Sequence, residues 1–369
     1  MMKFRFSLLA IPLLLFAKSP VLLSLEKASQ KGAVTPPPQE SPLIFTQEEA
    51  RGDFRTEFTF LYWQGSEDGL EFAAKNQPRF PSSTTLSTNL SASLISPEFS
   101  WEPGFKFLFG YHFADSSWDL DGRWTWIFFK SSGSASNPIS SDGKGLFPIW
   151  IAQQAAIAST PVYANSSATH FLHFNTFDID LSCSGGLSKA LFFKVLGGLK
   201  GIAIDQKYNV SYSNGFSDGT NEMLSSTAHL KNKCNGLGPR FGLGTRWGFP
   251  GEISLIGEFA VSSALSQMKT KREDVSLGLT SGTLQTVNIH SNESFWVWRP
   301  LIEAKAAVNW NYLWGKRGLL ALEVAYEMQQ FWEQNMMIRY ADSAIFFAAF
   351  NSRGNLFVQG LSLSATVGY

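Results

Sequence analysis

The segment Gly215–Gly219 carries the one arrangement in this chain that matches a nucleophile motif. It reads Gly-Phe-Ser-Asp-Gly and fits the G-x-S-x-G pattern of serine hydrolases. Those enzymes place the serine on a sharp turn between a strand and a helix. Here Asn, Ser, Asp and Gly surround the motif on both sides, which is typical of a polar surface loop. We recognise no set of Ser, His and acidic residues that could form a catalytic triad, so we expect no catalytic residues and no enzyme activity.

Metal and cofactor motifs are equally weak. His170 and His173 are the one close histidine pair, but at this odd spacing two strand residues face opposite ways. They therefore make a poor pair of metal ligands. The glycine run Gly236–Gly244 lacks G-x-G-x-x-G spacing, and Pro239 stands where a helix would have to begin. We expect neither a metal nor a cofactor and interpret the run as a glycine-rich strand.

Composition limits the class of protein. Charged residues make up 16% of the 369 residues and aromatic residues 14%, against about 25% charged residues in a soluble domain. After the N-terminus no apolar run approaches the ~20 residues that a membrane helix needs. The formal net charge is zero, so nothing suggests a nucleic-acid partner. Two-faced strands in a bilayer would produce such a composition.

The hairpin from 101 to 130 shows this two-faced pattern most clearly. One face carries aromatic side chains, and the other carries charges and small residues. A soluble β-sandwich also has alternating strands, but an unbroken aromatic row opposite several charges is typical of a membrane barrel. We predict that the lipid-facing residues are Phe105, Phe107, Phe109, Tyr111, Trp118, Trp124, Trp126 and Phe128.

The same alternation recurs to the end of the chain. Counting strand-like segments predicts an all-β fold, a single transmembrane antiparallel β-barrel of roughly 12–16 strands closed by the C-terminal strand, 361–369. The terminal aromatic residue, Tyr369, would act as an assembly signal. The residues predicted to face the lumen are Arg55, Glu57, Lys106, Asp119, Asp121, Arg123, Asp178, Asp180, Lys194, Lys200, Arg240, Arg246, Glu258, Arg299, Glu303, Lys305, Glu323 and Glu327.

The N-terminus predicts export. Lys3 and Arg5 precede an apolar stretch that is too short to span as an anchor, which is typical of a secretory signal peptide. We assign 1–25 to this leader without fixing its cleavage site, 26–50 to a disordered or extended lead-in rich in Pro, Gln, Glu and Ser, and 51–369 to the barrel. The segment Ile149–Ser159 is expected to be a short helix, either folded into the lumen as a constriction or lying on the surface.

Two functions fit such a barrel. A water-filled lumen lined by charges of both signs would pass ions and small hydrophilic solutes. Alternatively, the charges pair across a filled interior, giving a non-conducting structural barrel or a surface adhesin or antigen that presents long loops. We favour the pore because ~14 strands leave room for water whereas ~8 do not.

An ordered series of segments carries a family resemblance. It resembles the Legionella-type major outer membrane protein family of pore-forming barrels, found also among chlamydia-related bacteria. The similar segments are Pro97–Tyr111, Trp118–Phe128, Phe174–Leu181, Gly197–Tyr208, Asn235–Trp247, Arg299–Ala304, Tyr326–Asn335 and Asn355–Leu363. The resemblance implies a Gram-negative outer-membrane β-barrel with porin-like activity. The chain departs from the family in ending on Tyr rather than the commoner Phe.

The resemblance also implies partners. A barrel of this family would contact outer-membrane lipid and bind the barrel-assembly machinery through its C-terminal strand. A homo-oligomer is one alternative for its oligomeric state. Family members can be cross-linked through cysteines, and here Cys183 and Cys234 are available. Cys183 continues a lipid-side row and Cys234 is predicted to lie in a polar loop, so an internal disulfide would need that loop to fold over the rim. Two buried free thiols are the other alternative.

Overall fold

The computed structural model describes residues 53–77, 93–114, 116–139, 145–151, 162–188, 190–216, 221–314, 318–340 and 349–368. The expected leader and lead-in, over 1–50, lie outside these ranges, and so does Tyr369. No helix in the described ranges is long and apolar enough to cross a membrane.

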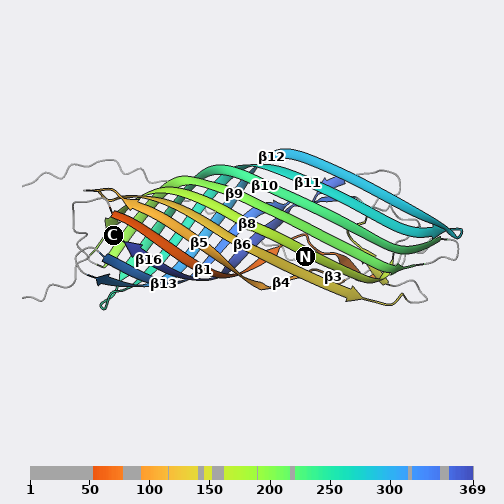
Figure 1. The fold of residues 1–369 in the computed structure, drawn as a ribbon, viewed down its shortest axis with the longest axis horizontal. Coiled ribbons are helices and arrows are strands. Elements are labelled where there is room, and N and C mark those ends of the chain that lie inside the picture. The colour runs from red at the N-terminus through yellow and green to blue at the C-terminus, as the bar shows by residue number, and fades with distance from the viewer. Residues whose placement is uncertain are drawn as a thin grey trace, which may run out of the picture. The chain divides into compact units, whose positions relative to one another are not determined.

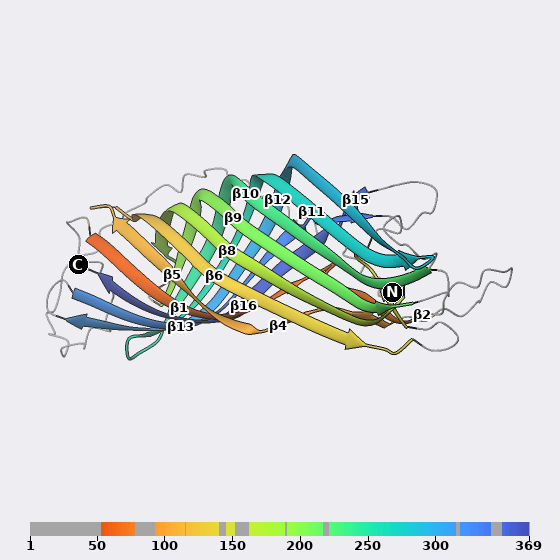
Figure 2. The ribbon, with the colours of Figure 1, turned by 45° about the vertical axis from the view of Figure 1, so that its right-hand side comes forward.

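Long antiparallel strands close into a ring (Figures 1 and 2). The C-terminal strand β16 pairs with β13 on one side and with β1 on the other, so that Leu361 lies opposite both Tyr326 and Tyr62. The predicted closure by the C-terminal strand is confirmed. In order around the ring, the strands are β1 (Asp53–Glu67), β5 (Trp101–His112), β6 (Trp118–Ser136), β8 (Tyr163–Gly186), β9 (Leu191–Gly215), β10 (Asn221–Gly248), β11 (Ile253–Thr280), β12 (Thr283–Trp314), β13 (Gly318–Asn335) and β16 (Gly354–Gly368).

The expected number of 12–16 strands is wrong, because the ring in the described residues has ten strands. Most of the strands are much longer than the ~9–11 residues that cross a bilayer, and β12 has 32 residues. The segment Gly236–Trp247, for example, is only the second half of β10. The same number of residues therefore makes fewer strands.

Short strands occupy the stretches that the sequence marks as long connections. β7 (Gly145–Pro148), β2 (Ala73–Gln77) and β3 (Ser93–Ile95) pair in series from the first residue of β8, Tyr163. β4 (Glu98–Phe99) pairs with β6, and β14 (Ile338–Tyr340) pairs with β15 (Ala349–Asn351). The described part of the expected helix, 149–151, is a bend, and 152–159 lies outside the described residues.

The outer face of the ring carries a belt of exposed apolar side chains. Phe241 and Trp298 are each 60% exposed on this face. All eight predicted lipid-facing residues lie on it, half of them exposed: Phe107, Phe109, Trp118 and Trp124. The other four are partly covered by neighbouring aromatic side chains. The centroids of the Phe105 and Trp126 side-chain rings, for example, are 5.4 Å apart.

The longer strands, such as β10 and β11, continue past the apolar belt at one end of the barrel. On β10 the outward residues from Leu237 to Trp247 are apolar except Thr245, whereas Lys231 and Lys233 point outward earlier in the same strand. We call the end where β1 begins and β16 stops the near end, and the opposite one the far end. Near-end connections such as 249–252 are short, whereas most far-end connections are longer, for example 137–162. An exception is the tight turn between β11 and β12, where Ser281 and Gly282 have positive φ angles of 48° and 77°.

Candidate functional site: the charged lumen

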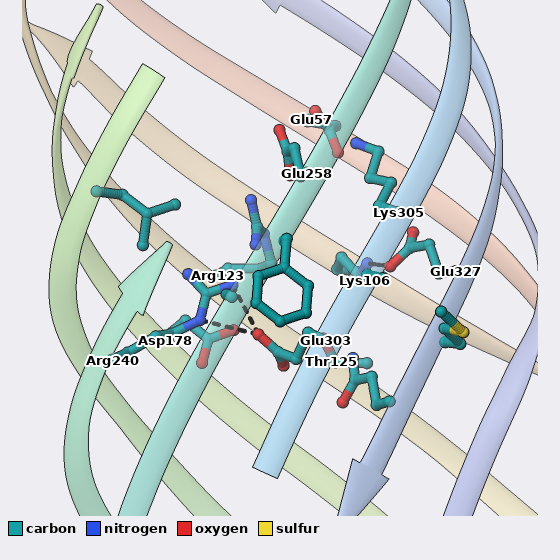
Figure 3. A pocket seen from close by; sticks show the side chains of 16 residues that line it. Glu57, Lys106, Arg123, Thr125, Asp178, Arg240, Glu258, Glu303, Lys305 and Glu327 are labelled. Carbon is teal, nitrogen blue, oxygen red and sulfur yellow. Dashed lines mark hydrogen bonds and ion pairs between the residues drawn. The ribbon is translucent and has the colours of Figure 1, made fainter. Parts of the chain in front are cut away.

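A network of buried ion pairs lies in the lumen, and Figure 3 shows Arg240, Glu303 and Asp178 of this network. The Arg240 guanidinium donates to Glu303 Oε2 from Nε at 2.9 Å and from Nη2 at 2.7 Å, and it also binds Asp180. Lys200 Nζ lies 2.8 Å from Asp178 Oδ1 and 2.5 Å from Glu303 Oε1. The network joins β8, β9, β10 and β12, with each charge beside an opposite one. Such pairing is what allows charges to be buried.

Two further pairs lie beside this network. Lys106 Nζ is 2.5 Å from Glu327 Oε2, and it reaches from β5 to β13, which are not neighbours in the ring. Lys305 pairs with Glu323 at 2.6 Å. The space among the side chains here, including the part open to solvent, is about 560 Å³. Because Lys106 spans several strands, the lumen at this level is narrow.

The near end holds another charged group. Arg55 of β1 lies 2.6 Å from Asp121 of β6, with Asp119 at 3.8 Å, and Lys194 lies 3.5 Å from Asp121. A Cβ atom at Gly110 would lie 2.5 Å from Asp121 Oδ1 and 2.7 Å from Arg55 Nε. Glycine at this position therefore leaves the room that the ion pair needs.

Every residue predicted to face the lumen lies on the inner face of its strand. The structure brings most of them into the ion-pair groups described above. Arg246 lies at the near-end mouth, where it donates to Ser254 at 3.1 Å and to Asn309 at 2.9 Å. Arg299 is different, because it lies beyond the charged groups, among apolar side chains.

An apolar layer crosses the lumen on the far side of the charges. Its members are fully or almost fully buried and come from most of the ring strands: Leu61, Trp63, Ile127, Phe129, Leu172, Phe174, Ile202, Ile204, Cys234, Ala264, Met268, Leu301, Phe331, Met336, Leu356 and Val358. Sequence reasoning missed this layer by treating the inner face as polar throughout. The available signal was the run Ile127–Phe129, which is apolar on both faces of its strand.

Beyond this layer, residues 68–77, 145–151 and 336–340 lie inside the far end, and we call these three segments the far-end plug. Trp150 is fully buried, and its Nε1 donates to the Glu71 carbonyl at 2.7 Å. From the wall, Tyr208 donates to the Leu70 carbonyl at 2.6 Å and Tyr212 to the Phe72 carbonyl at 2.5 Å. These bonds tie the plug to β9.

Arg272 of β11 joins two plug segments. It donates to the carbonyls of Ile338, at 2.8 Å, and of Trp150, and Asp274 holds its guanidinium. On the plug itself, the Arg339 guanidinium lies 4.4 Å from the Trp150 ring centroid, a cation–π distance. Sequence analysis did not single out Arg272 or Asp274, because their part of β11 carries no apolar alternation.

The cysteines do not pair, so of the two alternatives the structure has the free thiols. Cys183 lies on the outer face near the near-end turn, 3.3 Å from Ser117 Oγ, whereas Cys234 is buried in the apolar layer. Cys234 also lies within β10 and not in a polar loop. The wall of the barrel therefore separates the two thiols.

The other motifs occupy separate places. His170 is buried inside, with Nε2 3.4 Å from Glu67 Oε2, while His173 is on the outer face, 4.6 Å from the Phe128 ring. The two histidines thus face opposite ways, as expected. Of the G-x-S-x-G segment, 217–219 lies outside the described residues. In the described part of the chain, no group of three or more His, Cys, Asp or Glu residues could hold a metal ion.

A closed ring with apolar side chains outside and ionised groups inside defines a transmembrane β-barrel. The sequence profile of the Legionella pneumophila major outer membrane protein precursor matches residues 47–367. The chain belongs to this major outer membrane protein family, and it is located in the outer membrane. Short turns lie on the periplasmic side in such barrels, so the near end is periplasmic and the far end projects from the cell.

Several solved outer-membrane proteins are distantly similar to this chain. The outer membrane protease OmpT of Escherichia coli is 10% identical, with 86% of this chain and 96% of that chain covered and a TM-score of 0.36. A FadL homologue of Pseudomonas aeruginosa is 10% identical, with 86% and 90% covered and a TM-score of 0.26. The toluene transporter TodX of P. putida is 9% identical, with 86% and 89% covered and a TM-score of 0.29. Among curated proteins no sequence match is found.

Proposed function

We propose that this protein is an outer-membrane channel for ions and small hydrophilic solutes, closed in the conformation described here. The observation that supports it is the charged lumen. Ionisable side chains at membrane depth are costly and generally mark an ion or solute path. Buried ion pairs seldom stabilise a fold more than apolar side chains of similar volume would, so a barrel that served only as a scaffold gains little from them.

The closed state follows from the two blocks beyond the charges. The apolar layer crosses the lumen, and among the described residues the far-end plug occupies the projecting part of the barrel. A ten-stranded barrel is also too narrow for a wide water-filled pore, because ten strands enclose little more than their own side chains. Conduction therefore requires the plug and the apolar layer to move.

A non-conducting structural barrel that displays its far end at the cell surface is the second candidate. The full pairing of the Arg240 network and the buried apolar layer favour it, because a permanently filled interior needs both. The two candidates differ in one measurable property. Loosening the plug should produce ion flow only if a polar path can form.

The plug test uses Trp150→Ala. Removing a fully buried tryptophan costs about 3–5 kcal/mol, and here that loss falls on the contacts that hold the plug between Arg272 and Arg339. We expect the refolded variant in planar bilayers to open at least tenfold more often than the wild-type protein. Single-channel recording measures this directly.

Trp247→Ala is the matched control, since Trp247 is 54% exposed on the outer face and far from the plug. It should leave the opening frequency at the wild-type level. If neither the wild-type protein nor Trp150→Ala conducts while both remain folded, the channel proposal fails and the structural barrel takes its place.

A further inference from the structure

Exposed lysines gather on the outer face just beyond the apolar belt, on the far-end side. We call this set the lysine band, and its exposed members come from β6, β9, β10 and β11: Lys130, Lys207, Lys231, Lys233, Lys269 and Lys271. Nothing in the lumen or the plug uses these side chains, since they point away from the interior. The band therefore needs an explanation of its own.

The strand register places these lysines directly opposite one another. Lys231 lies opposite Lys207 on one side and Lys271 on the other. Lys233 likewise lies opposite Lys269. Like charges directly opposite on neighbouring strands destabilise a sheet, so such an arrangement calls for anions from outside the sheet.

Counterions within the described residues are too few for the band. Asp205 lies 3.2 Å from Lys233 Nζ and neutralises one member. Lys130 contacts the Phe171 ring, 6.0 Å from its centroid, through a cation–π interaction that supplies no negative charge. Glu273 follows Lys271 on the same face, one outward position further from the membrane. Most of the positive charge therefore stays available.

The height of the band relative to the membrane decides which anion can reach it. On β10 the apolar belt ends at Leu237, so Lys233 and Lys231 lie about 13 and 20 Å further along the strand. Barrel strands are tilted by about 35–45°, which shortens this rise, and a lysine stem can bend back toward the interface. The ammonium groups thus lie at the level of the lipid headgroups of the outer leaflet.

We propose that the lysine band binds the phosphate groups of phosphorylated lipid headgroups in the outer leaflet. Ammonium groups attract phosphate as point charges without demanding one geometry. Several of them on adjacent strands suit a headgroup that carries more than one phosphate. The inference rests on the belt and the band alone, so it holds whether or not the lumen conducts.

The test compares the wild-type protein with the triple variant Lys207→Gln/Lys231→Gln/Lys271→Gln in detergent micelles. The probe is a bisphosphorylated glycolipid, and the same glycolipid without its phosphates serves as the paired ligand. Each lysine near a charged lipid surface contributes about fivefold in affinity, so the triple variant should bind the phosphorylated probe on the order of 100-fold more weakly. Binding to the wild-type protein should also weaken with added salt.

Arg353→Gln is the control, because Arg353 is an exposed cation near the far end outside the band. It should bind the probe as the wild-type protein does. If the triple variant does not fold, Lys231→Gln alone should still lose about fivefold. Equal binding of the two glycolipids, or unchanged binding by the variants, would overturn the proposal. So would soluble polyphosphate that binds as tightly as the micellar probe, because the band would then select free polyanions and not lipid.

Discussion

Replacing Arg240 by methionine should lower the free energy of unfolding by about 3–5 kcal/mol. The guanidinium is shared between Glu303 and Asp180, and both carboxylates are buried. Without it these carboxylates lose a hydrogen-bonded partner in a region of low dielectric constant, and only Lys200 still contacts Glu303. Urea unfolding of the refolded barrel in lipid vesicles measures the change.

Arg246→Met on the same face of the same strand is the matched control. Its partners are neutral, Ser254 and Asn309, and it lies at the near-end mouth. No charge is stranded, so the loss should stay under about 1.5 kcal/mol. Adding Glu303→Gln to Arg240→Met should recover part of the stability, since it removes one stranded charge. Equal losses for Arg240→Met and Arg246→Met would show that the central network is not the buried, mutually dependent set described here.

The membrane-crossing part of the barrel could be predicted because lipid imposes a strict rule on the sequence. Each strand there has one face in lipid and the other in the lumen, so apolar and polar residues alternate, as from Leu237 to Trp247. This alternation correctly placed the inner charges and the outer aromatic residues. It could not supply their partners, because Lys106 and Glu327 are 221 residues apart in the chain. Their contact depends on how the ring closes.

The far-end half of the barrel could not be predicted, because the lipid rule that produces the alternation does not apply there. Beyond the hydrocarbon core the outer face meets the lipid headgroups and then water, so outward residues such as Lys269 and Lys271 need not be apolar and the alternation disappears. The apolar alternation that marks β11 therefore fades after about Ser262, although the strand continues to Thr280. Counting strand-like segments therefore overestimates the number of strands and, with it, the width of the pore.

The lipid assignment of the outer face predicts a large effect for Phe241→Arg. Phe241 is 60% exposed on β10, between Leu237 and Trp247 and thus near the middle of the apolar belt. An arginine at the middle of the bilayer should lower the free energy of unfolding by about 2–4 kcal/mol. Unfolding by guanidinium in lipid vesicles, monitored by tryptophan fluorescence, measures this loss.

Asn235→Arg separates the membrane from a general intolerance of the strand to arginine. Asn235 is exposed on the same face of β10 but lies beyond Leu237, toward the lysine band. Near the interface the same arginine should cost only about 0–1 kcal/mol, because its charged group reaches the headgroups. The difference between the two variants thus reports depth in the bilayer at constant chemistry. Should both variants lose the same stability, or neither lose any, the outer face of β10 would not be in contact with lipid, and the transmembrane assignment of this strand would have to be abandoned.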